Sequence, residues 1–142
     1  MRRSFLYPAL MLALSLGSAA HAEFPRVGVA DIPNGVSAPF DGFWAAGIPD
    51  ANGADGVSPD ACKNPIQLRA NGDHGLVYAA PNRPEIVYEL SEFSGRTTWL
   101  PIIGESTIAV WISADAFYAY AVGLTDGRAR WDDPRLYRRC PE

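Results

Sequence analysis

Residues 107–127, TIAVWISADAFYAYAVGLTDG, contain two short runs in which successive side chains alternate in character. The runs cover residues 107–113 and 116–124, and only two residues separate them. Alternation with a period of two is typical of a β-strand, because successive side chains point to opposite faces of a sheet. Asp126-Gly127 then favours a tight hairpin turn, since both residues tolerate a positive φ. This stretch therefore predicts antiparallel strands joined by short turns.

Similar β-rich runs, bounded by glycine, proline and asparagine, recur along the rest of the chain. They cover residues 40–48, 64–70, 76–80, 85–93, 96–102, 129–131 and 136–140. Helical spacing of apolar residues is not sustained after residue 22, and the short connections leave no room for crossover helices. The sequence therefore predicts an all-β domain, a small antiparallel up-and-down barrel of about eight strands, with a β-sandwich as the alternative.

The first 22 residues have the pattern of a cleaved signal peptide. Arg2 and Arg3 precede an apolar stretch over residues 5–16, and Ala20-His21-Ala22 is a small-x-small cleavage site. We expect export to the periplasm or the medium, by either the ordinary or the twin-arginine route. Residues 23–39 are rich in proline and glycine and predict an extended N-terminal arm. Residues 40–142 then form a single barrel domain.

Cys62 and Cys140 are the two cysteines of the chain. An exported protein meets an oxidising compartment, where an even number of cysteines indicates disulfide bonding. With two cysteines one pairing exists, so we expect a Cys62–Cys140 disulfide.

Composition and motifs argue against several classes of protein. The 142 residues carry a formal net charge of −4, which does not favour nucleic-acid binding. The sequence has neither a nucleotide-binding glycine motif nor a set of zinc ligands, and His74 is the one histidine after residue 22. The loop Asp50–Gly56 resembles a calcium loop but has Ala54 at a ligand position. We therefore expect no catalytic residues, no metal and no cofactor, and leave calcium at this loop open.

Aromatic residues are the best candidates for binding a ligand inside such a barrel. An eight-stranded barrel has an interior wide enough for side chains or for one small ligand. Tyr118 and Tyr120 share one face of their run, and the small residues Ala119 and Ala121 lie on the other. The candidate ligand-binding residues are Trp44, Trp99, Trp111, Tyr118 and Tyr120.

Gly42-Phe43-Trp44 opens the first run with a Gly-x-Trp motif. In this it resembles lipocalin-like secreted barrels, which carry Gly-x-Trp on their first strand ahead of a meander of hairpins. Small secreted bacterial inhibitors of metalloproteases are similar, although their two cysteines lie closer together than Cys62 and Cys140. The resemblance implies a barrel that holds a ligand or binds a protease, and it transfers no functional residue.

The C-terminal stretch has the composition of a protein-binding face. Arg128, Arg130, Trp131 and Arg135 lie close together in the sequence, and tryptophan and arginine are enriched at interface hot spots. We expect two functions in order of preference. The first is a secreted, non-catalytic module that binds a small apolar or aromatic ligand. The alternative is a periplasmic interaction protein, such as an inhibitor of a secreted hydrolase.

Overall fold

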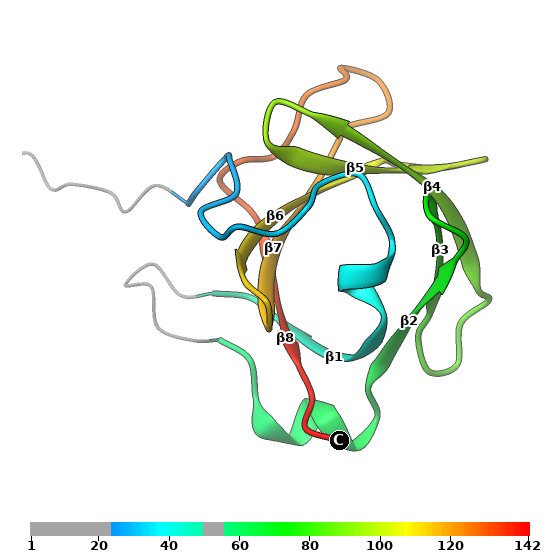
Figure 1. The fold of residues 1–142 in the computed structure, drawn as a ribbon, viewed down its shortest axis with the longest axis vertical. Coiled ribbons are helices and arrows are strands. Elements are labelled where there is room, and N and C mark those ends of the chain that lie inside the picture. Colours follow the sequence, from blue (N-terminus) through cyan, green and yellow to red (C-terminus); the bar gives the residue numbers. More distant parts are fainter. Residues whose placement is uncertain (1–23, 50–55) are drawn as a thin grey trace, which may run out of the picture.

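A computed structural model describes residues 24–49 and 56–142, and these form a closed barrel of eight antiparallel strands in sequence order (Figure 1). The strands are β1 (Gly42–Gly47), β2 (Ile66–Asn71), β3 (Gly75–Ala79), β4 (Ile86–Phe93), β5 (Arg96–Pro101), β6 (Thr107–Ser113), β7 (Ala116–Ala121) and β8 (Arg135–Arg139). The predicted barrel is confirmed, and the pairing of β1 with β8 rules out the sandwich. The predicted signal peptide, and residues 50–55 of the loop that resembles a calcium site, lie outside the described residues.

The two ends of the barrel differ in the length of their connections. Because neighbouring strands are antiparallel, alternate connections lie at opposite ends. One end carries the short turns at residues 72–74, 94–95 and 114–115. The other end carries the long connections, of which the described parts are residues 48–49, 56–65, 80–85, 102–106 and 122–134.

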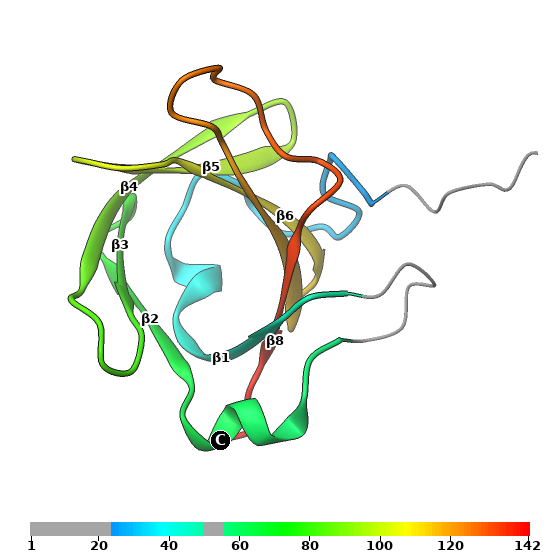
Figure 2. The same cartoon turned by 180° about the vertical axis from the view of Figure 1, so that it is seen from behind.

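The N-terminal segment seals the end with the short turns. Its backbone donates hydrogen bonds from Gly28 N to Gly95 O at 3.0 Å, and from Ser37 N to Asp73 O at 2.8 Å. It then enters the barrel as a 3₁₀ turn, η1 (Ala38–Phe40), which lies within the ring of strands in Figure 1. Figure 2 shows the barrel from the opposite side, with this segment at the back.

The predicted arm at residues 23–39 is therefore extended where it is described, but it packs on the barrel instead of standing apart from it. Its prolines and glycines prevent a regular strand, yet they leave backbone carbonyls and amides that bond to the turns. Gly35 illustrates the close approach. Its φ is +77°, and a Cβ at this position would lie 2.8 Å from the backbone nitrogen of Glu92.

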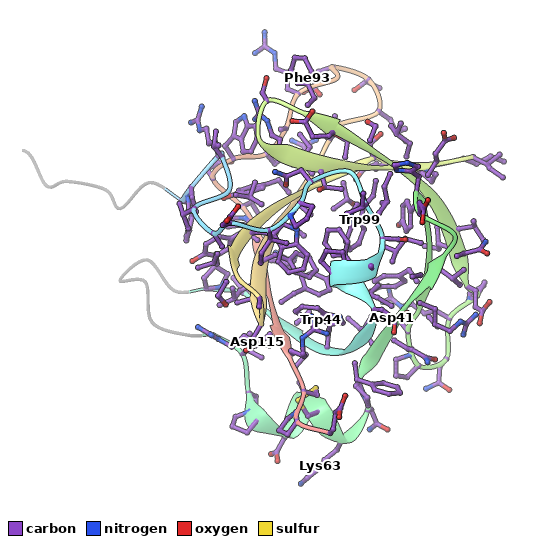
Figure 3. All side chains as sticks on the ribbon, viewed as in Figure 1. Asp41, Trp44, Lys63, Phe93, Trp99 and Asp115 are labelled. Carbon is purple, nitrogen blue, oxygen red and sulfur yellow. A yellow bond between two sulfur atoms is a disulfide. The ribbon has the colours of Figure 1, made fainter. Side chains whose placement is uncertain are left out.

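Aromatic rings fill the sealed end of the barrel. Phe40 and Trp44 are completely buried, and Trp44 and Trp99 point into the barrel in Figure 3. The ring of Phe40 lies 4.5 Å from that of Trp111 and 5.2 Å from that of Phe117, measured between centroids. Burying each such side chain stabilises the fold by about 1.5–3 kcal/mol, and paired rings add to this.

Arg139, on the last strand, holds the sealing segment in place. Its guanidinium donates to Pro39 O at 2.8 Å, to Asp41 O at 2.7 Å and to Ala114 O at 3.1 Å. Its central carbon also lies 4.3 Å from the ring of Trp44. One side chain therefore joins the start of β1, the end of β8 and the turn between β6 and β7.

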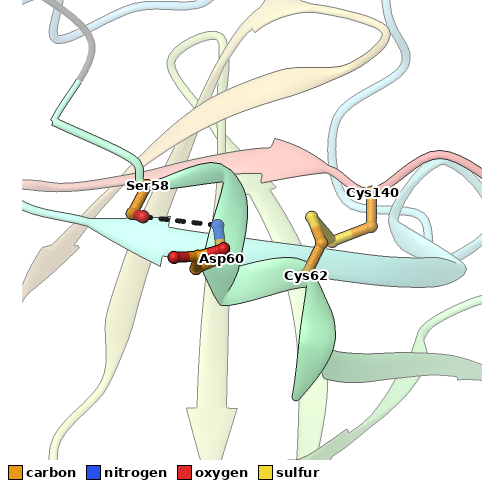
Figure 4. The surroundings of a disulfide bond; sticks show 4 residues. All are labelled: Ser58, Asp60, Cys62 and Cys140. Carbon is orange, nitrogen blue, oxygen red and sulfur yellow. Dashed lines mark hydrogen bonds between the residues drawn. A yellow bond between two sulfur atoms is a disulfide. The ribbon is translucent and has the colours of Figure 1, made fainter.

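The predicted Cys62–Cys140 disulfide is present, with the two Cα atoms 5.6 Å apart (Figure 4). Cys62 lies in a second 3₁₀ turn, η2 (Pro59–Lys63). This turn begins where the Ser58 hydroxyl accepts a hydrogen bond from Asp60 N at 3.3 Å. The disulfide therefore ties the connection between β1 and β2 to the C-terminal end of the chain.

Reducing this disulfide should lower the free energy of unfolding by up to about 4.5 kcal/mol, because it closes a loop with a sequence separation of 78. Urea unfolding with and without reductant measures the change. The variant C62A/C140A should match the reduced protein, and it should not respond to reductant. A change below about 1 kcal/mol would contradict this expectation.

Phe40→Ala should lower the free energy of unfolding by about 3–5 kcal/mol, because it leaves a cavity among the rings at the sealed end. The matched control is Phe43→Ala in β1, which removes an aromatic ring from a side chain that is 49% exposed. The control should change stability by less than about 1 kcal/mol. Equal losses in the two variants would show that Phe40 does not hold the sealed end together.

Candidate functional site

A cavity of about 240 Å³ opens at the end of the barrel with the long connections. Its lining residues come from the inward faces of six strands and from the connection between β3 and β4. They are Tyr78, Arg83, Pro84, Ile86, Tyr88, Trp99, Thr107, Ala119, Ala121, Arg135 and Tyr137. The N-terminal segment seals the opposite end, so ligand access would be from this side.

Aromatic side chains form the deep part of the cavity. Trp99 is 1% exposed, and its ring lies 5.5 Å from that of Tyr88 and 6.4 Å from that of Tyr137. On its other side, the same indole packs against Phe40 at 5.4 Å and Phe117 at 5.8 Å. Trp99 therefore separates the filled end of the barrel from the cavity and contacts both.

Small side chains provide the room for this cavity. Ala119 and Ala121 point inward from β7, where Ala119 pairs with Ala109 and Ala121 with Thr107. Larger residues at these inward positions would extend the aromatic core towards the mouth. The alternation of small and bulky residues in β7 is thus the sequence feature that creates the space.

Tyr88 and Tyr137 contribute neutral hydroxyl groups to the cavity. Burial raises the pKa of Tyr137 far above its usual range, and the charge of Tyr78 and a hydrogen bond with it act in the same direction. Burial also raises the pKa of Tyr88. These hydroxyls therefore remain protonated at physiological pH and are able to donate hydrogen bonds to a ligand.

Two buried indole nitrogens lack a hydrogen-bond partner within the described part of the chain, and they belong to Trp99 and Trp111. By contrast, Trp44 Nε1 donates to Phe40 O at 2.8 Å. A buried donor without an acceptor is costly, by about 1–3 kcal/mol. Both nitrogens are shielded among the packed rings, so this cost belongs to the aromatic core of the barrel.

Two arginines lie at the rim of the cavity. Arg135 begins β8 and forms an exposed ion pair with Asp133 at 3.3 Å. Arg83 belongs to the connection between β3 and β4. Within the described ranges, no aspartate or glutamate lines the cavity.

The structure places the five aromatic residues that were predicted to bind a ligand in three different regions. Trp99 lines the cavity, whereas Trp44 and Trp111 belong to the aromatic core at the sealed end. Tyr118 and Tyr120 lie on the outer face of β7, because their register places Phe117, Ala119 and Ala121 inside.

The N-terminal segment covers the outward tyrosines. The ring of Phe24 lies 5.4 Å from that of Tyr118, and the Tyr120 hydroxyl donates to Pro25 O at 2.6 Å. Burial raises the pKa of Tyr120 well above its usual range. These tyrosines hold the segment against the barrel.

The structure divides the four residues predicted to bind a partner. Arg128 and Arg130 are exposed in the connection between β7 and β8, and Arg135 lines the cavity instead. Trp131 is half-buried against Tyr120, with ring centroids 4.8 Å apart. The guanidinium carbons of Arg26 and Arg96 lie 5.4 Å and 4.9 Å from its ring.

Sequence reasoning missed three tyrosines and one arginine of the cavity: Tyr78, Tyr88, Tyr137 and Arg83. The alternation in β4 places Tyr88 on one face with Ile86 and Leu90, but it does not say which face is inside. If the inward-facing residues of one strand were known, the pairing register would identify the inward-facing residues of each neighbouring strand in a closed barrel. The tyrosines of the cavity could then have been predicted.

A second, more open hollow of about 600 Å³ lies on the outside of the barrel. Val87, Glu89 and Leu100 line it from β4 and β5, and His74 lines it from the turn between β2 and β3. His74 is exposed, and its Nδ1 lies 2.7 Å from Gly35 O. Its ring therefore helps to hold the N-terminal segment.

Within residues 24–49 and 56–142, no group of three or more His, Cys, Asp or Glu side chains is arranged to hold a metal ion. No helix in the same ranges is long and apolar enough to cross a membrane.

Comparisons with known proteins find no family model, no curated protein and no solved structure that matches the chain. The resemblance to lipocalin-like barrels therefore stays a prediction from Gly42 and Trp44. The function is inferred from the barrel and its cavity alone.

Proposed function

We propose that this protein is a non-catalytic binding protein that holds a small aromatic or apolar ligand in the open end of its barrel. The observation that carries the proposal is the cavity of about 240 Å³, which the indole of Trp99 and the phenols of three tyrosines line. A mainly apolar hollow with a few polar groups that converge on it is the usual form of a ligand site.

The size of the cavity limits the ligand. Sites for drug-sized molecules have volumes of about 300–1,000 Å³, so a volume of about 240 Å³ favours a smaller molecule. The aromatic floor favours a flat or ring-shaped body, because rings pack well edge to face on other rings.

The sealed end supports a preformed site. Phe40 packs on the core side of Trp99, and the N-terminal segment is tied down by Arg139. A floor that is already ordered loses little conformational freedom when a ligand binds, which favours affinity.

We further propose that the protein acts outside the cytoplasm, in the periplasm or the medium. The disulfide is compatible with an oxidising compartment. The resemblance to lipocalin-like secreted barrels favours the same location and the same mode of binding.

Ala119→Leu should weaken ligand binding at least tenfold, because the larger side chain occupies the cavity. The probes are 3-phenylpropanoate and its neutral amide, 3-phenylpropanamide. NMR titration of ¹⁵N-labelled protein should shift the indole N–H resonance of Trp99, which Trp99→Phe assigns. The stability of Ala119→Leu should stay close to that of the wild type, since the new side chain fills open space.

The matched control is Ala114→Leu, which makes the same change at an exposed turn of the sealed end. It should leave both titrations unchanged. If neither probe moves the Trp99 resonance, or if Ala119→Leu binds as the wild type does, the cavity is not a ligand site.

A second candidate function is suggested by exposed apolar side chains on the outside of the barrel. Ile102 and Ile103 are 93% and 90% exposed in the connection between β5 and β6, next to the hollow with Val87 and Leu100. Such patches are typical of protein-binding surfaces.

The interaction function predicts inhibition of a secreted protease by the purified protein. I102S/I103S should weaken that inhibition at least tenfold, because interface anchors are lost, while Ala119→Leu should inhibit as the wild type does. The measurement is the rate of casein hydrolysis. The opposite pattern would assign inhibition to the cavity end instead of this surface.

A further inference from the structure

The charge at the mouth of the cavity is opposite to that of the protein. The chain has 16 acidic and 12 basic residues, yet the described lining of the cavity has two arginines and no acidic side chain. A positively charged mouth favours a negatively charged ligand, because it attracts anions and repels cations.

Arg135 is placed to meet a ligand from the wall of the barrel. It pairs with Ala119 across β7 and β8, so it lies beside the small residues that create the cavity. Its ion pair with Asp133 joins side chains that are 48% and 64% exposed, and such a pair is weak. A guanidinium has five N–H donors, so most of them remain for a ligand.

Arg83 reaches the cavity from the connection between β3 and β4. Its backbone N donates to Ala80 O at 3.4 Å, which fixes the turn that carries it. The nearby Glu85 is bound to Arg69 at 3.0 Å, and it is not part of the lining. Arg83 therefore adds positive charge to a lining that holds no acidic side chain within the described residues.

The remaining polar side chains of the cavity are the hydroxyls of Tyr78, Tyr88, Thr107 and Tyr137, each of which can donate or accept a hydrogen bond. A guanidinium donates only, and its planar fork matches the two oxygens of a carboxylate. The two arginines therefore favour a ligand that accepts hydrogen bonds and carries negative charge.

We propose that the occupant of this cavity is a small organic carboxylate. Its carboxylate accepts hydrogen bonds from Arg135 and Arg83 at the mouth, and its apolar body lies against Trp99. This inference rests on the proposed function of the cavity and specifies the chemistry of its ligand.

Three probes with the same body but different head groups test the proposal. They are 3-phenylpropanoate, the neutral 3-phenylpropanamide and the cationic 3-phenylpropylamine, and their dissociation constants come from NMR titration of the full mature protein. The carboxylate should bind about 10- to 100-fold more tightly than the amide, as expected for charge-assisted hydrogen bonds, and the amine should bind most weakly. Added salt should weaken binding of the carboxylate and leave that of the amide unchanged.

Arg135→Gln and Arg83→Gln should each weaken binding of the carboxylate about tenfold or more and change that of the amide less than about twofold. The matched control is Arg128→Gln, which removes an exposed arginine outside the cavity from the same end of the barrel. It should leave all three constants unchanged. Circular dichroism and the melting temperature establish that each variant is folded.

The outcomes separate this inference from the function on which it rests. If the amide binds as tightly as the carboxylate, or if both arginine variants keep the preference, the ligand is not an anion although the cavity still binds. If none of the three probes binds the wild type, both the inference and the proposed function are wrong.

Discussion

The guanidinium of Arg139 joins the closing strand of the barrel to the segment that seals its end. It donates to the carbonyl of Pro39 within η1 and to that of Asp41 just after it, and it packs on Trp44, so the start of β1 and the end of β8 are held by one side chain. The pairing of these two strands closes the sheet and removes its free edges. Closure also gives every strand an inner and an outer face, with alternate side chains pointing inward. The positions of the core and of the cavity follow from this.

The interior of an eight-stranded barrel has a limited volume, and this chain divides it between two uses. Rings of Phe40, Trp44, Trp111 and Phe117 fill the end with the short turns. Alanines on β7 leave the other end open. Trp99 separates the two regions, so a ligand would rest on a floor that the fold already needs for its stability. A substitution in the core that displaces Trp99 is therefore expected to alter both stability and binding.

The strands were predictable because their signal is local. Alternation in residues 107–127 and in β4 indicates strands without knowledge of any partner, and the two cysteines allow one disulfide pairing. The phase of the alternation is not local. Tyr118 and Tyr120 are bulky and share a face, which suggested an inward position, but the N-terminal segment provides them with a covered site outside the barrel. Nothing in that proline-rich segment indicates that its carbonyls bind residues 95 positions away. Arg83 was missed for a similar reason, since a residue of a connection reaches the cavity only through the path of the folded chain.

The cavity combines fixed positive charge with hydroxyls that do not ionise, and this combination has a consequence for its chemistry. A tyrosine that lost its proton would place a negative charge beside a bound carboxylate and repel it. Burial works against this, because it raises the pKa of Tyr137 and of Tyr88 and keeps both phenols neutral. A bound anion would raise these pKa values further, since it too disfavours the phenolate. Neither Tyr88 nor Tyr137 therefore adds negative charge to the lining at physiological pH, and both remain available as neutral hydroxyls beside a bound carboxylate.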